Sequence, residues 1–184
     1  NMGEVCNAGS RLLVERSIHD EFVERFMALG SDAYQPGDPL DPATNMGPLV
    51  TRDAQQRVLR LVETGQREGA RLQFGGGAPR GLESGAYVSP TLFTGVRNDM
   101  TIAREEIFGP VAAVIPFDGA DEAIAISNGT AYGLSSAVCT NRLDYITRFV
   151  AEHNATPKPV IWKAHPDAII AAQNRGFQAL ESIH

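Results

Sequence analysis

The spacing of hydrophobic residues near the start of the chain predicts a short apolar element followed by an amphipathic helix. Residues 11–15 (RLLVE) are apolar enough for a buried strand or for the end of an apolar helix. Ser17 is a candidate N-cap for a helix over residues 17–33, because an acidic residue follows in the first turn. The apolar positions of this helix recur at helical spacing and define one face: Ile18, Phe22, Val23, Phe26 and Met27.

A second amphipathic helix is predicted after a proline-rich loop. The loop, residues 35–50, contains four prolines and two glycines, which prevent regular structure. The helix is expected to begin at Thr51 and to continue to about residue 69. Its inner face consists of Val58, Leu61 and Val62.

The second half of the chain alternates between apolar runs and helical patterns. Residues 70–93 predict a strand, a glycine-rich turn and an extended segment. Residues 110–117 (PVAAVIPF) are continuously apolar, which is typical of a strand covered on both faces. A helix over residues 118–129, a second apolar strand over 132–140 and a helix over 142–153 are expected to follow. This order predicts an α/β fold with a mostly parallel sheet flanked by helices.

Composition limits the class of protein and its partners. The chain has 184 residues, of which 43% are hydrophobic and 21% charged, as in an ordinary globular domain. The net charge of −6 and the lack of a long apolar run give no reason to expect nucleic acid or a membrane as a partner. The two cysteines, Cys6 and Cys139, are too few for a disulfide framework or a metal site, so a cytoplasmic location is expected. Cys139 is expected in the core.

Two motifs resemble those of one enzyme family. The segment GEVCNAGSRLLV, which contains Cys6, resembles the nucleophile motif of the NAD(P)-dependent aldehyde dehydrogenases, roughly GQxCxAxxR. The segment REEIFGPV, which contains Glu106, matches the family's EEIFGPV signature at every position. The 100 positions from Cys6 to Glu106 are also the spacing that the family shows. The resemblance covers residues 1–150 and implies the fold of the family's catalytic domain.

The resemblance also implies a chemistry for the motif residues. Cys6 would attack an aldehyde through its thiolate, with its own backbone N–H as an oxyanion donor, and hydride would pass to NAD or NADP to leave a thioester. Glu106 would bind the ribose hydroxyls of the nicotinamide half, and Phe108 would lie against that ring. Without the motif, the simplest interpretation of Cys6 would be a small, inert core residue.

Other motifs of the family do not occur in this chain. The LELGGK-type motif with the general base is absent, and so is the GxxxxG turn that receives the pyrophosphate. We therefore expect residues 1–150 to be a catalytic domain without the dinucleotide-binding domain, with little dehydrogenase activity alone. Residues 151–184 form a divergent C-terminal segment. A homo-oligomer is expected, and the substrate would be a small-molecule aldehyde, weakly indicated as polar by Asn7. A cysteine esterase and a catalytically inactive fragment or scaffold remain as alternatives.

Overall fold

The computed structural model describes residues 1–155, apart from the side chains of residues 31, 32 and 154. Its centre is a four-stranded sheet in the order β1-β4-β3-β2. The strands are β1 (Arg11–Glu15), β2 (Arg71–Phe74), β3 (Thr91–Thr94) and β4 (Val111–Phe117). Strand β4 pairs in parallel with both β1 and β3, and only β2 runs antiparallel to its neighbour. The predicted α/β fold with a mostly parallel, helix-flanked sheet is confirmed.

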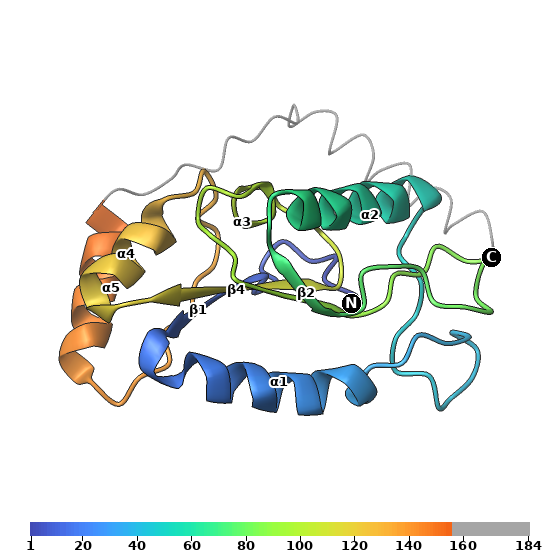
Figure 1. The fold of residues 1–184 in the computed structure, drawn as a ribbon, viewed down its shortest axis with the longest axis horizontal. Helices are drawn as coiled ribbons and strands as arrows, with labels where there is room; N and C mark the ends of the chain where they lie inside the picture. The colour runs from blue at the N-terminus through green and yellow to red at the C-terminus, as the bar shows by residue number, and fades with distance from the viewer. Residues whose placement is uncertain (156–184) are drawn as a thin grey trace, which may run out of the picture.

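Helices cover both faces of this sheet. Helix α1 (His19–Ala33) lies on one face, and α2 (Arg52–Arg67) with the short α3 (Thr101–Arg104) lies on the other, as Figure 1 shows. The two faces have separate apolar clusters, because side chains of a strand alternate between its sides. Buried side chains on the α2 face include Val58, Val62, Phe93, Ile102, Ala103, Ala113 and Ile115. Those on the α1 face are Val14, Leu92 and Val114, packed against Phe22, Val23, Phe26 and Met27 of the helix. Strand β4 is thus covered on both sides, as predicted.

The starts of the first two long helices differ in how well the sequence predicted them. Thr51 is the N-cap of α2, and its side chain accepts a hydrogen bond from the Ala54 N–H at 3.1 Å. The prediction that Ser17 caps α1 is wrong. Residues Arg16–Ile18 form a 3₁₀ turn, so α1 begins only at His19, with no side-chain cap at its first turn. Ile18, expected on the inner face, is 53% exposed for the same reason.

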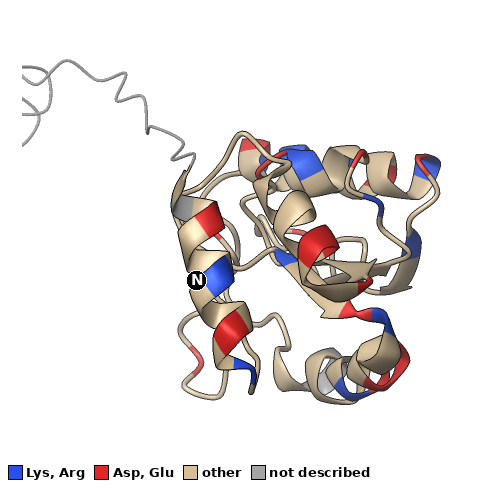
Figure 2. Cartoon of the chain, turned by 90° about the vertical axis from the view of Figure 1, so that its left-hand side faces the viewer, with Lys and Arg blue, Asp and Glu red and all other residues tan. Residues whose placement is uncertain are grey.

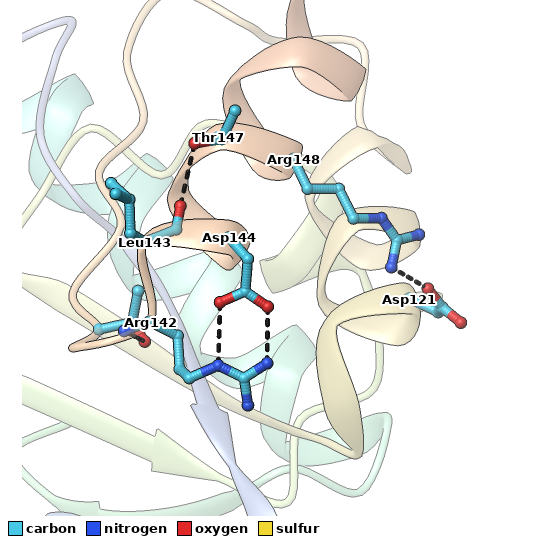
Figure 3. Close-up of polar contacts among 7 residues, drawn as sticks. Asp121, Arg142, Leu143, Asp144, Thr147 and Arg148 are labelled. Carbon is cyan, nitrogen blue, oxygen red and sulfur yellow. Dashed lines mark hydrogen bonds and ion pairs between the residues drawn. The ribbon is translucent and has the colours of Figure 1, made fainter.

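The remaining two helices, α4 (Gly119–Asn128) and α5 (Leu143–Ala155), pack at one end of the sheet (Figure 1). Arg148 of α5 forms an ion pair with Asp121 of α4 at 2.5 Å (Figure 3). Acidic and basic residues are interspersed on the helices seen from this side (Figure 2). Among residues 1–155, no helix is both long and apolar enough to cross a membrane.

The predicted strand over residues 132–140 is wrong, and so is the prediction that Cys139 is a core residue. No strand forms there, and the segment is exposed along most of its length, with Leu134 at 58% and Tyr132 at 47%. Cys139 is exposed as well. A strand needs a backbone partner for its N–H and C=O groups. In the part of the chain that the structure describes, this segment pairs with no strand. It does not pair with β1 either, although β1 is at the edge of the sheet and has β4 as its one neighbour there.

Candidate active site

The sheet topology brings the loops of the two motifs to the same edge. Strands β1 and β4 are parallel neighbours, with Arg11 opposite Ala113 in the register. Cys6 lies in the loop that enters β1, and Glu106 lies in the loop that enters β4. Since parallel neighbouring strands start at the same edge and lie about 5 Å apart, the two loops meet there despite the 100 positions between their functional residues.

A glycine pair shows how tightly these loops pack. Gly3 has a φ of +73°, and a Cβ placed on it would lie 2.1 Å from the carbonyl oxygen of Gly109. Any larger residue would therefore both strain the backbone and push the loops apart. Gly109 is enclosed from the other side, because a Cβ on it would lie 2.6 Å from a methyl carbon of Val58 in α2. The loop before β1, the loop before β4 and helix α2 thus form one packed unit.

Cys6 is exposed on the surface of this unit. It lies in a turn that is closed by a hydrogen bond from the Ala8 N–H to the Val5 carbonyl, at 3.0 Å. Its thiol is free and accessible, so the interpretation of Cys6 as a small buried core residue does not hold. Exposure by itself does not distinguish Cys6 from Cys139, which is also exposed. The difference lies in the surroundings of Cys6, whose loop contacts, through Gly3, the loop that carries Glu106.

The loop before β4 presents alternate side chains outward. Ile107 is 1% exposed and anchors the loop in the core, whereas Glu106 and Phe108 on either side of it are exposed. Phe108 has a φ of +55°, which is unusual for a residue other than glycine and is maintained only where the surroundings enforce it. A carboxylate and a partly exposed aromatic ring, two positions apart on a backbone anchored by Ile107, suit a ribose with an attached ring. The residues present therefore fit the nicotinamide half of a dinucleotide.

Two residues that the motifs did not indicate hold these loops in place. The guanidinium of Arg57, in α2, donates hydrogen bonds to the carbonyl oxygen of Ile107 at 2.6 Å and to that of Glu106. The carboxylate of Glu4 accepts from the Val50 N–H at 3.0 Å, just before the cap of α2. No local pattern reveals either role, because a charged residue on a helix surface or in a loop is usually solvated.

Arg11 fixes the start of β1, five residues after Cys6. Its guanidinium donates to the Asn98 side-chain oxygen at 2.8 Å and to the Ile126 carbonyl, at the end of α4, at 2.7 Å. Burial lowers the pKa of Arg11 below its usual value, because the charged form loses hydration. Strand β1, which follows the cysteine loop, is thereby attached to helix α4, which lies outside the sheet.

The three candidate residues, Cys6, Glu106 and Phe108, are exposed. Two shallow cavities, of about 320 and 220 Å³, occur elsewhere, one against α1 and the other near residues 34–36. Neither is lined by Cys6, Glu106 or Phe108. Residues 1–155 contain no group of three or more His, Cys, Asp or Glu side chains placed to hold a metal ion.

Comparisons with known proteins agree with the motifs. The model of the Aldehyde dehydrogenase family matches residues 1–160. The chain is 40% identical to the betaine aldehyde dehydrogenase of Brucella anthropi, over 97% of this chain and 39% of that protein. It is 44% identical to the aldehyde dehydrogenase 1A1 of Gallus gallus, over 82% of this chain and 29% of that protein.

A solved structure has a similar fold. The aldehyde dehydrogenase of Mycobacterium tuberculosis, crystallised in complex with NAD+, superposes with a TM-score of 0.78 at 42% identity, over 82% of this chain and 31% of that one. The chain therefore spans less than two fifths of the length of these relatives. From the family match, the sequence identities and the shared fold, this chain belongs to the aldehyde dehydrogenase family.

Proposed function

We propose that this chain is the catalytic domain of an enzyme that oxidises an aldehyde to a carboxylic acid with NAD or NADP. One observation supports this most directly: the accessible Cys6 loop packs, through Gly3 and Gly109, against the loop that presents Glu106 and Phe108. The loops that carry the proposed nucleophile and the proposed cofactor contact are far apart in sequence and in contact with each other. The family relationship supports the same reaction.

In this proposal Cys6 forms the covalent bond to the substrate. Its thiolate adds to the carbonyl carbon and gives a thiohemiacetal oxyanion. The Cys6 backbone N–H, which has no hydrogen-bond acceptor among the described residues, is available to stabilise that oxygen. The bound dinucleotide supplies the hydride acceptor, so that the carbon becomes a thioester on Cys6. Water then cleaves the thioester, releases the acid and restores the thiol.

Glu106 and Phe108 would hold the nicotinamide half of the cofactor. The Glu106 carboxylate can accept hydrogen bonds from the two neighbouring ribose hydroxyls, and the Phe108 ring offers an apolar contact beside them. Because the buried Ile107 anchors the backbone between them, the backbone does not need to reorganise before the cofactor binds.

The remaining parts of the reaction belong to a longer protein in this proposal. The chain corresponds to between 29% and 39% of its relatives, and it has neither the LELGGK-type general base nor the pyrophosphate-binding turn. We propose residues 1–150 as the catalytic domain and residues 151–184, most of which lie outside the described residues, as a divergent segment. A cytoplasmic homo-oligomer acting on a small aldehyde completes the proposal. Asn7 and the relatives named betaine aldehyde dehydrogenases favour a polar substrate.

Acylation by a p-nitrophenyl ester tests the role of Cys6. We expect a burst of about one equivalent of nitrophenol, with the acyl group on Cys6 by mass spectrometry, followed by very slow turnover. Cys6→Ala should abolish this burst. Cys139→Ala is the matched control, because it removes the other exposed thiol of the described residues and should leave the burst unchanged. Equal acylation of the two thiols would contradict the proposal and favour an inactive fragment or scaffold, whereas rapid repeated turnover would favour a cysteine esterase.

Binding of NAD+ or β-nicotinamide mononucleotide tests the cofactor contact. The expected result is a change in the NMR amide signals of residues 106–109 on titration, weakened in Glu106→Ala. Glu105→Ala is the matched control, since this exposed neighbour has no role in the proposal. Absence of any change in the wild type, or equal binding by the two variants, would refute Glu106 as a cofactor contact.

A further inference from the structure

The side chain of Arg57 connects helix α2 to the loop that presents Glu106 and Phe108. Its two terminal nitrogens donate to two consecutive backbone carbonyls: Nη1 to Ile107 at 2.6 Å and Nη2 to Glu106. These contacts span 50 and 49 positions of sequence. They therefore attach the loop to an element that is remote along the chain.

The guanidinium suits this position because two adjacent carbonyls require two donors in a fixed arrangement. Its planar fork offers parallel N–H groups, whereas a lysine ammonium is a single point of attachment. Hydrogen bonds with a charged donor are also stronger than neutral ones. The helix itself is held in position, since its next residue, Val58, is 1% exposed and packs against Gly109.

The two carbonyls that Arg57 binds lie directly before a residue with an unusual backbone conformation. Glu106 and Ile107 immediately precede Phe108, the residue with a φ of +55°. A backbone in this conformation reverts to a more common one unless contacts on both sides enforce it. Gly109 is held from the far side by Gly3 and Val58, and Arg57 is the polar contact on the near side.

We propose that Arg57 is a positioning residue of the cofactor site: it fixes the peptide units of Glu106 and Ile107 so that the Glu106 carboxylate and the Phe108 ring face one ligand. This inference rests on the proposed function of Glu106 and Phe108. In it, Arg57 acts through the two carbonyl groups, and its removal leaves the helix and the sheet in place while the loop gains freedom.

Hydrogen exchange measures the first part of the proposal. In Arg57→Ala we expect the amides of residues 106–109 to exchange about tenfold faster or more, with little change in β4 and α2. Arg60→Ala is the matched control, because Arg60 is exposed on the same helix and makes no side-chain hydrogen bond among the described residues. Arg57→Lys should lie between wild type and Arg57→Ala. Unchanged exchange in Arg57→Ala, or exchange raised evenly over the whole chain, would overturn the inference.

Ligand binding separates positioning from a merely structural role. β-Nicotinamide mononucleotide is titrated into the 184-residue wild type and the same variants, and amide signals of residues 106–109 report binding. We expect the dissociation constant to rise about fivefold in Arg57→Ala, to rise less in Arg57→Lys and to stay unchanged in Arg60→Ala. If the wild type binds and Arg57→Ala binds equally well, Arg57 has no positioning role. If the wild type itself shows no binding, the proposed cofactor site is wrong. That outcome differs from equal binding by the wild type and Arg57→Ala, which refutes only the role of Arg57.

Should Arg57→Ala fail to fold, as judged by urea unfolding, Arg57→Lys alone decides the question. It keeps the positive charge but has a single donor nitrogen in place of the two in the planar fork, so faster exchange of residues 106–109 with weaker mononucleotide binding supports the inference. Wild-type values in both measurements would overturn it.

Discussion

Strand β4 and residues 132–140 have similarly apolar sequences but form different structures. Both VAAVIPF and YGLSSAVCT predict strands, yet only the first forms one. Strand β4 has a partner on each side and helices over both faces, and Ala113, Val114 and Ile115 are at most 2% exposed. Residues 132–140 have no partner strand in the described part of the chain and remain largely exposed. An apolar run becomes a strand only where other backbone is available to pair with it.

The candidate site and helix α5 differ in a similar way, in the contacts that hold them. The candidate site is held by packed glycines and by hydrogen bonds to backbone carbonyls. Helix α5, beyond residues 132–140, contacts α4 through the exposed ion pair of Arg148 with Asp121 and through the side chains of His153 and Asn128, while the exposed pair of Arg142 with Asp144 lies within its own start (Figure 3). Exposed ion pairs contribute little to stability. We therefore expect substitutions in the sheet core and at the candidate site to lower the free energy of unfolding more than substitutions in residues 132–155.

Truncation of an apolar side chain should show the largest difference. Ile115→Ala in β4 removes a side chain that is 2% exposed, and should lower the free energy of unfolding by about 3 kcal/mol. Leu134→Ala, at a residue 58% exposed, should change it by less than about 0.5 kcal/mol. Urea denaturation measures both. Similar losses would mean that residues 132–140 are packed in solution and would break the comparison.

Alanine at Gly3 should have the next largest effect. The positive φ and the closeness of the Gly109 oxygen predict a loss of about 2 kcal/mol, together with slower acylation of Cys6. Gly9→Ala in the same loop is the control, because no atom lies within 4 Å of a Cβ placed there. Denaturation and ester-burst kinetics test the pair. Wild-type behaviour of Gly3→Ala would show that the two loops do not need to touch.

Loss of a threonine hydroxyl should have a smaller effect that again depends on the region. Thr51→Ala removes the cap of α2, and we expect a loss of about 1 kcal/mol. Thr140→Ala removes a hydroxyl that accepts a hydrogen bond from the Arg142 N–H in an exposed turn, and the expected loss is under about 0.5 kcal/mol. Thermal and urea unfolding compare the two. A larger effect at Thr140 would reverse the order expected from the structure.

The smallest effect concerns pH and the start of α5. Arg142 lowers the pKa of the Asp144 carboxyl through a charge-assisted hydrogen bond. Because the folded pKa lies below that of the unfolded chain, the contribution is present above the unfolded value of about 4 and is lost as pH falls through the folded value. Amide exchange in the first turn of α5 should therefore accelerate slightly in acid. In Asp144→Asn this acid step should be absent, and a step of the same size there would contradict its assignment to Asp144.

The sequence motifs indicated the exposed residues of the candidate site but not the residues that hold its loops. Cys6, Glu106 and Phe108 were predicted from short motifs, and the structure places their loops side by side. The roles of Arg57 and Glu4 could not be predicted, because each depends on a backbone group about 50 positions away. A hydrogen bond between residues that far apart in the sequence produces no local sequence pattern.

The sequence by itself determined much of the local structure: helix α2 with its Thr51 cap, the buried strand β4 and the family motifs. These features depend on side-chain spacing and on groups a few residues apart. Only the tertiary structure decided that residues 132–140 stay unpaired, that Ser17 lies in a 3₁₀ turn, and that Gly3 meets Gly109. Pairing of strands and packing of loops depend on which distant backbone groups become neighbours, and that information is not contained in any single segment.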